Sequence, residues 1–119
     1  MPFIIARVNT PVTHEQEIAI KSRLGQAIES VPGKSEEYLM VGIEADYHFY
    51  LRGAEQKAAY IEVSIFGNEA HLGYDTLSAE ITETMEQELH IPPENVYIKY
   101  DDIKAWSVNG FYIDRARFR

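Results

Sequence analysis

Pro2 is the residue of this sequence with the most distinctive possible chemistry. Proline is the one residue whose backbone nitrogen becomes a secondary amine when no residue precedes it, and here only Met1 precedes it. The small side chain at position 2 favours removal of Met1 during normal N-terminal processing. A free Pro2 would be a base held by its ring at the start of an apolar run. If Met1 is retained, the same nitrogen is a tertiary amide without basicity.

The overall composition excludes several classes of protein. The 119 residues fit one domain with an ordinary hydrophobic share of 45% and charged share of 25%. The absence of cysteine removes disulfides and thiolate chemistry. A net charge of -8 argues against a nucleic-acid partner, which would need a basic face. No apolar run is long enough to span a membrane, and no secretory signal is recognisable, so we expect no membrane partner and a cytoplasmic protein, with release without a signal peptide as an alternative.

Other groups of residues are weak candidates for a catalytic, metal or phosphate site. The four histidines are scattered without a neighbouring carboxylate cluster, so we expect no metal site. The pair Asp101-Asp102 reads as a solvated turn, and Gly67-Asn68 reads as a turn-rich connection rather than a phosphate loop. We therefore expect no cofactor.

The first part of the chain predicts a strand, a helix and a second strand. Residues 2–8 are apolar and rich in β-formers, and turn residues follow them. Thr13 and Gln16 form a capping-box pattern at the start of a helix over 14–31, which has an apolar stripe at helical spacing. Apolar residues alternate over 37–45, which predicts the second strand.

The same pattern then returns. Residues 58–66 predict a strand, a helical stripe follows at Leu77, Ile81, Met85 and Leu89, and residues 95–100 predict another strand. The connecting segment 46–57 has a candidate edge strand at 48–50 and a turn at 52–53. A last short strand is expected over 106–113. The basic tail 114–119 is expected to fray, with capping of a neighbouring subunit as the alternative.

The two halves superpose as a duplicated β-α-β unit. The matched pairs are Phe3 and Ile5 with Ile61 and Val63, Ile20 and Leu24 with Leu77 and Ile81, and Tyr38 and Leu39 with Tyr97 and Ile98, at shifts of 58, 57 and 59 residues respectively. Right-handed crossovers place both helices on one face of a four-stranded sheet, an α+β two-layer sandwich. The other face, carrying Tyr38, Met40 and Tyr97, would remain uncovered, which predicts an oligomer.

An ordered set of short motifs carries a family resemblance that extends to about Tyr100. The motifs are Met1-Pro2 at the first strand, Gly33-Lys34 and Tyr38 before the second, Ser64-Ile65 at the end of the third, and Val96-Tyr97-Ile98 after Ile91-Pro92-Pro93. In this order and spacing the chain resembles the macrophage migration inhibitory factor family of the tautomerase superfamily. We expect one such domain over 1–119, with β-α-β units at 2–45 and 58–100 and a C-terminal strand and tail at 105–119.

The resemblance implies a homotrimer in which strands extend across subunits and the active sites lie at subunit interfaces. The implied reaction is cofactor-free keto–enol tautomerisation of α-keto acids such as phenylpyruvate. By the same resemblance, Pro2 would be the catalytic base. The implied substrate-binding groups are Lys34 for the carboxylate, the backbone N–H of Ile65, Tyr97 from the adjacent subunit, and Tyr38 in the pocket wall.

These residue types make that chemistry coherent. A general base works best with a pKa near ambient pH, and both burial and a nearby cation lower the pKa of an amine. The apolar groups around Pro2 would supply the first effect. Lys34 would supply the second, with Lys99 as a further candidate, and the same cations would bind a carboxylate and stabilise an enolate.

The sequence also departs from the family. Lys99 stands where vertebrate members carry asparagine, and beside Tyr97 it has the alternative of pairing with an acidic group across the interface. Lys57 and Tyr60 occupy the positions of the family's cysteine pair, so thiol-redox activity is excluded. Residues 106–110 match the family's ending only with a short deletion.

Two other functions stay open. A non-catalytic, cytokine-like trimer that binds a small anion or a protein partner is the main alternative, and retained Met1 would favour it. A related hydrolytic or dehalogenating activity ranks lower, because the arginine and glutamate groups of the resembled dehalogenases have no counterpart that we can place.

Overall fold

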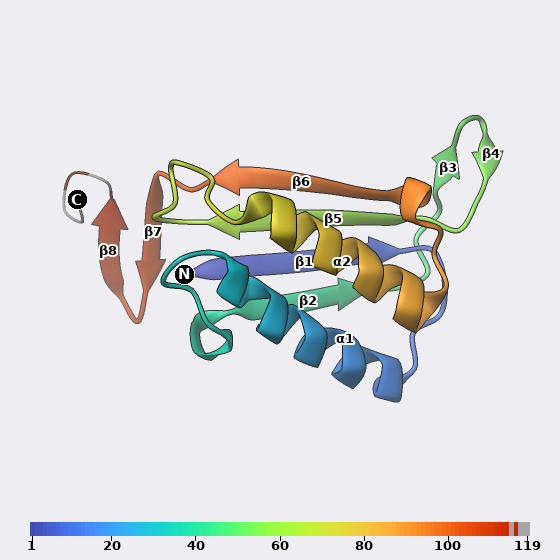
Figure 1. Cartoon of the computed structure of the whole chain (residues 1–119), viewed down its shortest axis with the longest axis horizontal. Helices are drawn as coiled ribbons and strands as arrows, with labels where there is room; N and C mark the ends of the chain where they lie inside the picture. The colour runs from blue at the N-terminus through green and yellow to red at the C-terminus, as the bar shows by residue number, and fades with distance from the viewer. Residues whose placement is uncertain (115, 117–119) are drawn as a thin grey trace.

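The chain folds into a four-stranded sheet with two helices lying across one of its faces (Figure 1). The computed structural model describes residues 1–114 and 116. The principal elements are β1 (Pro2–Val8), α1 (His14–Ala27), β2 (Met40–Glu44), β5 (Ala59–Ile65), α2 (Tyr74–Leu89) and β6 (Val96–Asp102). The strands lie in the order β2-β1-β5-β6, parallel within each β-α-β unit and antiparallel between β1 and β5. The predicted α+β sandwich is confirmed.

The core lies between the helices and one face of the sheet. Alternate residues of β1 and β5 are buried, because successive side chains of a strand point to opposite faces. The predicted helical stripes face them. The fully buried large side chains of the two central strands and two helices are Ile4, Val8, Ile61, Ile65, Ile20, Leu24, Leu77, Ile81 and Met85.

A single shift of 57 residues relates the two halves. Strands β1 and β5 begin at Pro2 and Ala59, and their registers pair Phe3 with Met40 and Tyr60 with Tyr97. The expected shifts of 58 and 59 for the strands were wrong. Because side chains alternate, a one-residue error exchanges the faces of a strand. Phe3 therefore lies on the open face, and Tyr97 corresponds to Met40 rather than to Tyr38.

The first helix ends earlier than predicted, whereas the second ends at Leu89, the last residue of its predicted stripe. The capping box of Thr13 and Gln16 is present, but α1 stops at Ala27 and continues as a short 3-10 turn, η1 (Ile28–Ser30), before Pro32. Helix α2 ends where His90 adopts a left-handed conformation, with φ of 58°, and the next short turn is η3 (Pro93–Asn95). The second predicted strand begins late for a similar reason, because η2 (Glu36–Tyr38) precedes β2.

Two hairpins project from opposite ends of the sheet, along a molecule 46 Å in its longest dimension (Figure 1). One is formed by β3 (Tyr50–Leu51) and β4 (Ala54–Glu55), with the predicted turn at residues 52–53, although its first strand starts two residues later than expected. The other is formed by β7 (Ala105–Val108) and β8 (Phe111–Asp114). A single strand over 106–113 was wrong, because Asn109-Gly110 adopts positive φ at both positions and reverses the chain. The fraying predicted for the tail lies outside the described residues at positions 115 and 117–119.

The open face of the sheet carries large apolar side chains, as predicted. Met40 and Tyr97 are 67% and 56% exposed on the two outer strands. None of the helices among residues 1–114 and 116 combines the length and apolar character that crossing a membrane requires.

Candidate active site

Pro2 and Ile65 face each other where β1 begins and β5 ends. They are partners in the antiparallel register, and both are buried. The neighbouring pair is hydrogen-bonded, since the N–H of Phe66 donates to the carbonyl of Met1 over 3.5 Å. Pairs in an antiparallel ladder alternate between bonded and non-bonded, so Pro2 occupies a non-bonded position. The missing N–H of proline therefore costs the sheet no hydrogen bond.

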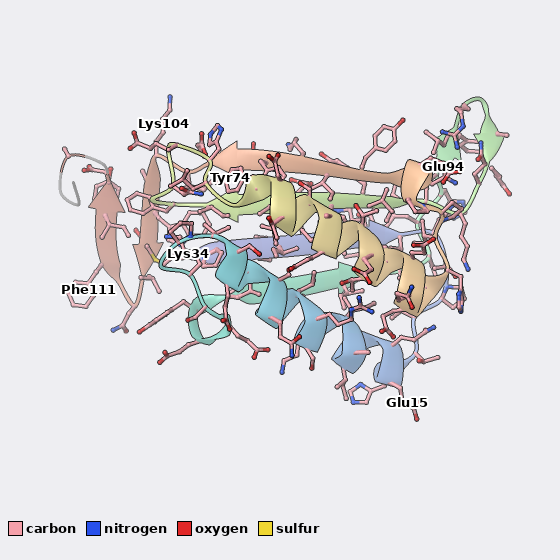
Figure 2. All side chains as sticks on the ribbon, viewed as in Figure 1. Glu15, Lys34, Tyr74, Glu94, Lys104 and Phe111 are labelled. Atoms are coloured by element: carbon pink, nitrogen blue, oxygen red, sulfur yellow. The ribbon has the colours of Figure 1, made fainter. Side chains whose placement is uncertain are left out.

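Lys34 reaches the same end of the sheet from the segment between the first helix and β2. Its backbone N–H donates to the carbonyl of Val31 over 3.1 Å, which closes a turn before the side chain extends. The ammonium then donates to the carbonyl of Phe66 over 2.8 Å. Figure 2 shows Lys34 beside the start of β1. The structure thus brings Pro2, Lys34 and Ile65 together from three separate segments.

The N-terminal amine lies in an environment that disfavours its charged form. With Met1 in place the Pro2 nitrogen is an amide, and the Met1 α-amine stands one residue outside the position that a free Pro2 amine would take. The pKa of this amine is lowered from 8.0 to about 6. Burial is the largest cause, followed by the charge of Lys34 and a hydrogen bond with it. The Met1 α-amine is thus largely neutral at neutral pH.

Tyr38 lies at the same end of the sheet but does not close the site within this chain. It belongs to η2, two residues before Met40, and Met40 is paired with Phe3. Its side chain is 66% exposed.

Tyr97 lies near the opposite end of the sheet from Pro2. The register places Tyr97 beside Tyr60, which is paired with Arg7, whereas Ile65 lies beside Asp102. Tyr97 and Asp102 are five positions apart along β6, which corresponds to roughly 16 Å. One chain therefore does not bring Tyr97 to Pro2.

Lys99 lies on the open face among acidic groups of its own chain. Its ammonium is 3.6 Å from Asp101 and 3.8 Å from Glu62. The pKa of Lys99 is raised, first by Asp101 and then by Tyr60 and Glu62. Lys99 thus has acidic partners within its own chain, whereas the sequence suggested an acidic partner across an interface.

The structure adds the turn that follows β5, which the sequence analysis treated as a simple connection. The Phe66 carbonyl holds Lys34, and Gly67 lies beside the ammonium. Further along the same loop, His71 Nε2 is 2.6 Å from Asp102 Oδ2. In the sequence, this turn was indicated only by Gly67, and a glycine at a chain reversal does not reveal which residues the turn contacts.

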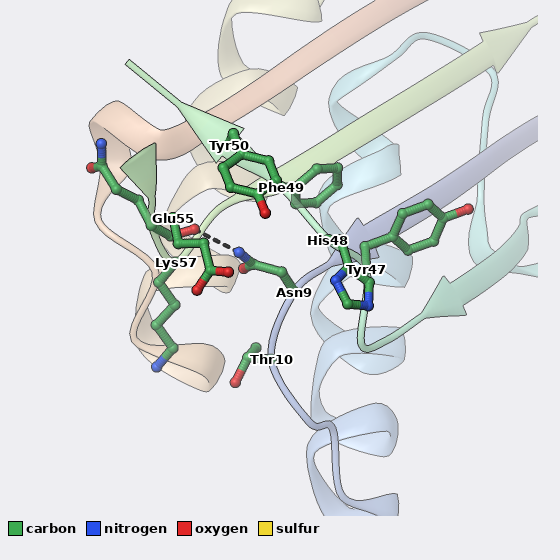
Figure 3. A pocket seen from close by; sticks show the side chains of 9 residues that line it. Asn9, Thr10, Tyr47, His48, Phe49, Tyr50, Glu55 and Lys57 are labelled. Atoms are coloured by element: carbon green, nitrogen blue, oxygen red, sulfur yellow. Dashed lines mark hydrogen bonds between the residues drawn. The ribbon is translucent and has the colours of Figure 1, made fainter. Parts of the chain in front are cut away.

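An open pocket lies elsewhere on the molecule. Figure 3 shows this open pocket of about 400 Å³ between the end of β1 and the β3–β4 hairpin. It is lined by Asn9, Thr10, Tyr47, His48, Phe49, Tyr50, Glu55, Gln56 and Lys57. None of the predicted site residues lines it. A smaller apolar hollow of about 200 Å³ on the other side of the hairpin includes Tyr97.

Solved structures share the fold of this chain. Leishmania major MIF2 superposes with a TM-score of 0.88 at 23% identity, covering 95% of this chain and 97% of that one. A fused 4-OT wild-type asymmetric trimer superposes with a TM-score of 0.79 at 14% identity, covering 92% and 94%.

Sequence comparison then gives the family. Residues 1–112 match the profile of the macrophage migration inhibitory factor family, so the chain belongs to that family. The macrophage migration inhibitory factor of Rattus norvegicus is 27% identical over 108 residues, which cover 91% of this chain and 93% of that protein.

Proposed function

We propose that this protein is a cofactor-independent keto–enol tautomerase of phenylpyruvate-like α-keto acids, with Pro2 as its general base once Met1 is removed. The observation that carries the proposal is the position of the N-terminal amine. With Met1 present, burial and Lys34 lower the pKa of the Met1 α-amine to about 6. The same two causes would lower the pKa of a free Pro2 amine one residue further in, as suits a base that works near neutral pH.

In the proposed reaction, carbon loses a proton and oxygen gains one during enolisation, and ketonisation is the reverse. In enolisation, the Pro2 nitrogen takes a proton from the carbon next to the carbonyl, and the C–H electron pair becomes part of the new C=C bond. The carbonyl oxygen gains a proton and becomes the enol hydroxyl. In ketonisation, the hydroxyl loses its proton and the Pro2 ammonium returns one to carbon.

Substrate binding is proposed to divide between two chains. Lys34 binds the carboxylate and the backbone N–H of Ile65 is a second anchor, while Tyr38 borders the pocket. Tyr97 and Lys99 enter from an adjacent subunit. The separation of Tyr97 from Pro2 within one chain supports this division, because both residues can share a site only between copies.

We also propose that the protein is a homotrimer. Its open sheet face carries exposed Met40 and Tyr97, and two hairpins extend beyond the sheet, where they can reach neighbouring copies. One structural relative is described as an asymmetric trimer. A cytoplasmic location is part of the proposal and is tested by cell fractionation.

Replacing Pro2 with glycine tests the enzymatic proposal. Pro2→Gly should abolish phenylpyruvate ketonisation, because it removes the ring amine while leaving a small residue at the start of β1. The trimer should persist in sedimentation analysis. Turnover equal to that of the unaltered protein would eliminate Pro2 as the base.

The alternative is a non-catalytic trimer that binds a small anion or a protein partner. Lys34 supports it, since the ammonium lies beside the N-terminus with Met1 in place. An intact-mass measurement separates the two functions: retained Met1 with no turnover favours binding, whereas loss of Met1 with turnover favours catalysis.

A further inference from the structure

The loop between β5 and α2, residues 66–73, packs against the turn that presents Lys34. At one end of the loop, the Phe66 carbonyl accepts the hydrogen bond from the Lys34 ammonium over 2.8 Å. At the other end, Gly73 approaches the backbone so closely that an added Cβ would overlap the Ser30 carbonyl. The carbonyl of Val31, the residue after Ser30, accepts from the Lys34 N–H. The loop thus meets the Lys34 turn at both ends.

Contacts within the described residues hold this loop in one conformation. The side chain of Asn68 donates to the Leu72 carbonyl over 2.9 Å and accepts from the Leu72 N–H over 3.3 Å. His71 pairs with Asp102 at the end of β6. The preceding strand is fixed as well, because the N–H of Ile103 donates to the Ile65 carbonyl over 2.9 Å. The Phe66 carbonyl is therefore a fixed acceptor for Lys34.

Gly67 sets the direction of that acceptor. The Phe66 carbonyl and the Gly67 nitrogen belong to one peptide unit, so the φ angle of Gly67 governs how this carbonyl is oriented relative to the rest of the loop. That φ is +91°, a value that residues with a Cβ rarely adopt. A Cβ at this position would also lie 3.4 Å from the Lys34 ammonium nitrogen. A side chain at position 67 would thus disfavour the φ that directs the acceptor, and its Cβ would contact the cation.

We propose that Gly67 is a positioning residue that, through the Phe66 carbonyl, holds the Lys34 ammonium beside the N-terminal amine. This inference rests on the proposed function only where it assumes that Lys34 binds a substrate carboxylate. The effect of Gly67 on the pKa of the N-terminal amine does not depend on turnover. Displacement of Lys34 removes a nearby positive charge, so the charged form of the amine becomes easier to form.

The test compares Gly67→Ala with Gly53→Ala. Gly53 has a φ of +80° in the β3–β4 hairpin and no atom within 4 Å of an added Cβ, so it reproduces the backbone strain far from Lys34. The pKa of the N-terminal amine is measured by NMR on each protein, as isolated. We expect Gly67→Ala to raise it above its value in the unaltered protein, though not to the value of the same amine in denaturant, because burial remains. Gly53→Ala should leave it unchanged.

A second comparison separates positioning from a general structural effect. In a Lys34→Ala background, Gly67→Ala should produce no further rise, because the cation is already absent. For the active enzyme, Gly67→Ala alone should raise KM about tenfold, as expected for loss of a well-placed hydrogen bond to a charged group. Should Gly67→Ala not fold, Gly67→Asn adds the same Cβ with less backbone strain.

Three results would overturn the proposal. They are an unchanged amine pKa in folded Gly67→Ala or Gly67→Asn, an equal rise in Gly53→Ala, and an undiminished further rise in the Lys34→Ala background. A raised amine pKa in a protein without tautomerase activity would support the positioning role and count only against the proposed function.

Discussion

At the scale of single residues, the site depends on one cation placed beside one amine. Lys34 is held by a backbone carbonyl 32 positions away along the chain, so its charge is directed rather than free in solvent. That placement lowers the pKa of the N-terminal amine in addition to the larger effect of burial. The same ammonium is available to a substrate carboxylate, which couples base tuning to substrate binding.

Removal of the Lys34 charge should change both binding and pH dependence. Lys34→Ala should raise KM for phenylpyruvate by about 10- to 100-fold, the range for a lost hydrogen bond to a charged group. The amine must be neutral to act as a base, so kcat/KM rises as pH passes its pKa. Without Lys34 that pKa is higher, and the rise should move to higher pH.

The matched control is Lys21→Ala, which removes an exposed lysine that pairs with Glu36 over 3.4 Å, away from the N-terminus. Its pH profile should coincide with that of the unaltered protein. If the Lys34→Ala profile also coincides, Lys34 does not tune the base.

The sequence was sufficient to propose Pro2 and Lys34 as candidates, because each has a chemistry that its residue type carries wherever it lies. It was not sufficient to select Gly67 or the Phe66 carbonyl. Every residue has a backbone carbonyl, so the residue type does not show which carbonyl accepts a hydrogen bond from Lys34. That partner is defined only when the chain folds and β5 meets the Lys34 turn. The site roles of Pro2, Lys34 and Ile65 remain predictions, as do those of Tyr97, Tyr38 and Lys99.

At the scale of elements, patterns within one helix or strand were more informative than alignment between the two halves. The stripe of Leu77, Ile81 and Met85 identified the buried face of α2 correctly. The alignment of Phe3 with Ile61 was one residue out, because both faces of β1 carry apolar side chains and alternation alone cannot choose between them. The position of the helices determines which face of β1 is buried, since both helices cover the same face of the sheet (Figure 1).

The capping box at the start of α1 allows a quantitative check at this scale. The Gln16 N–H donates to the Thr13 hydroxyl over 3.1 Å, and the Thr13 N–H donates to the Gln16 side chain over 2.8 Å. Thr13→Ala should therefore lower the free energy of unfolding by about 1 kcal/mol. Urea unfolding at fixed protein concentration measures it.

Thr76→Ala is the comparison, because Thr76 is an exposed residue of α2 and alanine has the higher helix propensity. It should be neutral or slightly stabilising. Equal losses in the two variants would show that the capping box contributes nothing specific.

At the scale of the whole molecule, the candidate site is divided. Pro2 and Lys34 lie at one end of the sheet and Tyr97 near the other, so the two parts meet only if copies associate. Closed rings of identical chains make such contacts in a head-to-tail arrangement. Assembly would then be a condition of activity, and not only a source of stability.

Mixing of inactive variants tests this division. Pro2→Gly and Tyr97→Ala homotrimers should each have little activity, because every site lacks one group. Unfolding and refolding them together in equal amounts should restore about one quarter of the sites, those that combine an intact Pro2 with an intact Tyr97 of a neighbour. Mixing without unfolding is the control. No recovery after joint refolding would contradict a site shared between subunits.

The central claim is that the Pro2 nitrogen is a free ring amine whose pKa is lowered by the folded protein, and ¹⁵N NMR of proline-labelled protein tests it directly. The account predicts that the Pro2 signal titrates as an amine, with a pKa well below its value for the same protein in denaturant. A Pro2 nitrogen that does not titrate, because Met1 still acylates it, or one that titrates equally in the folded and unfolded protein, would contradict the account.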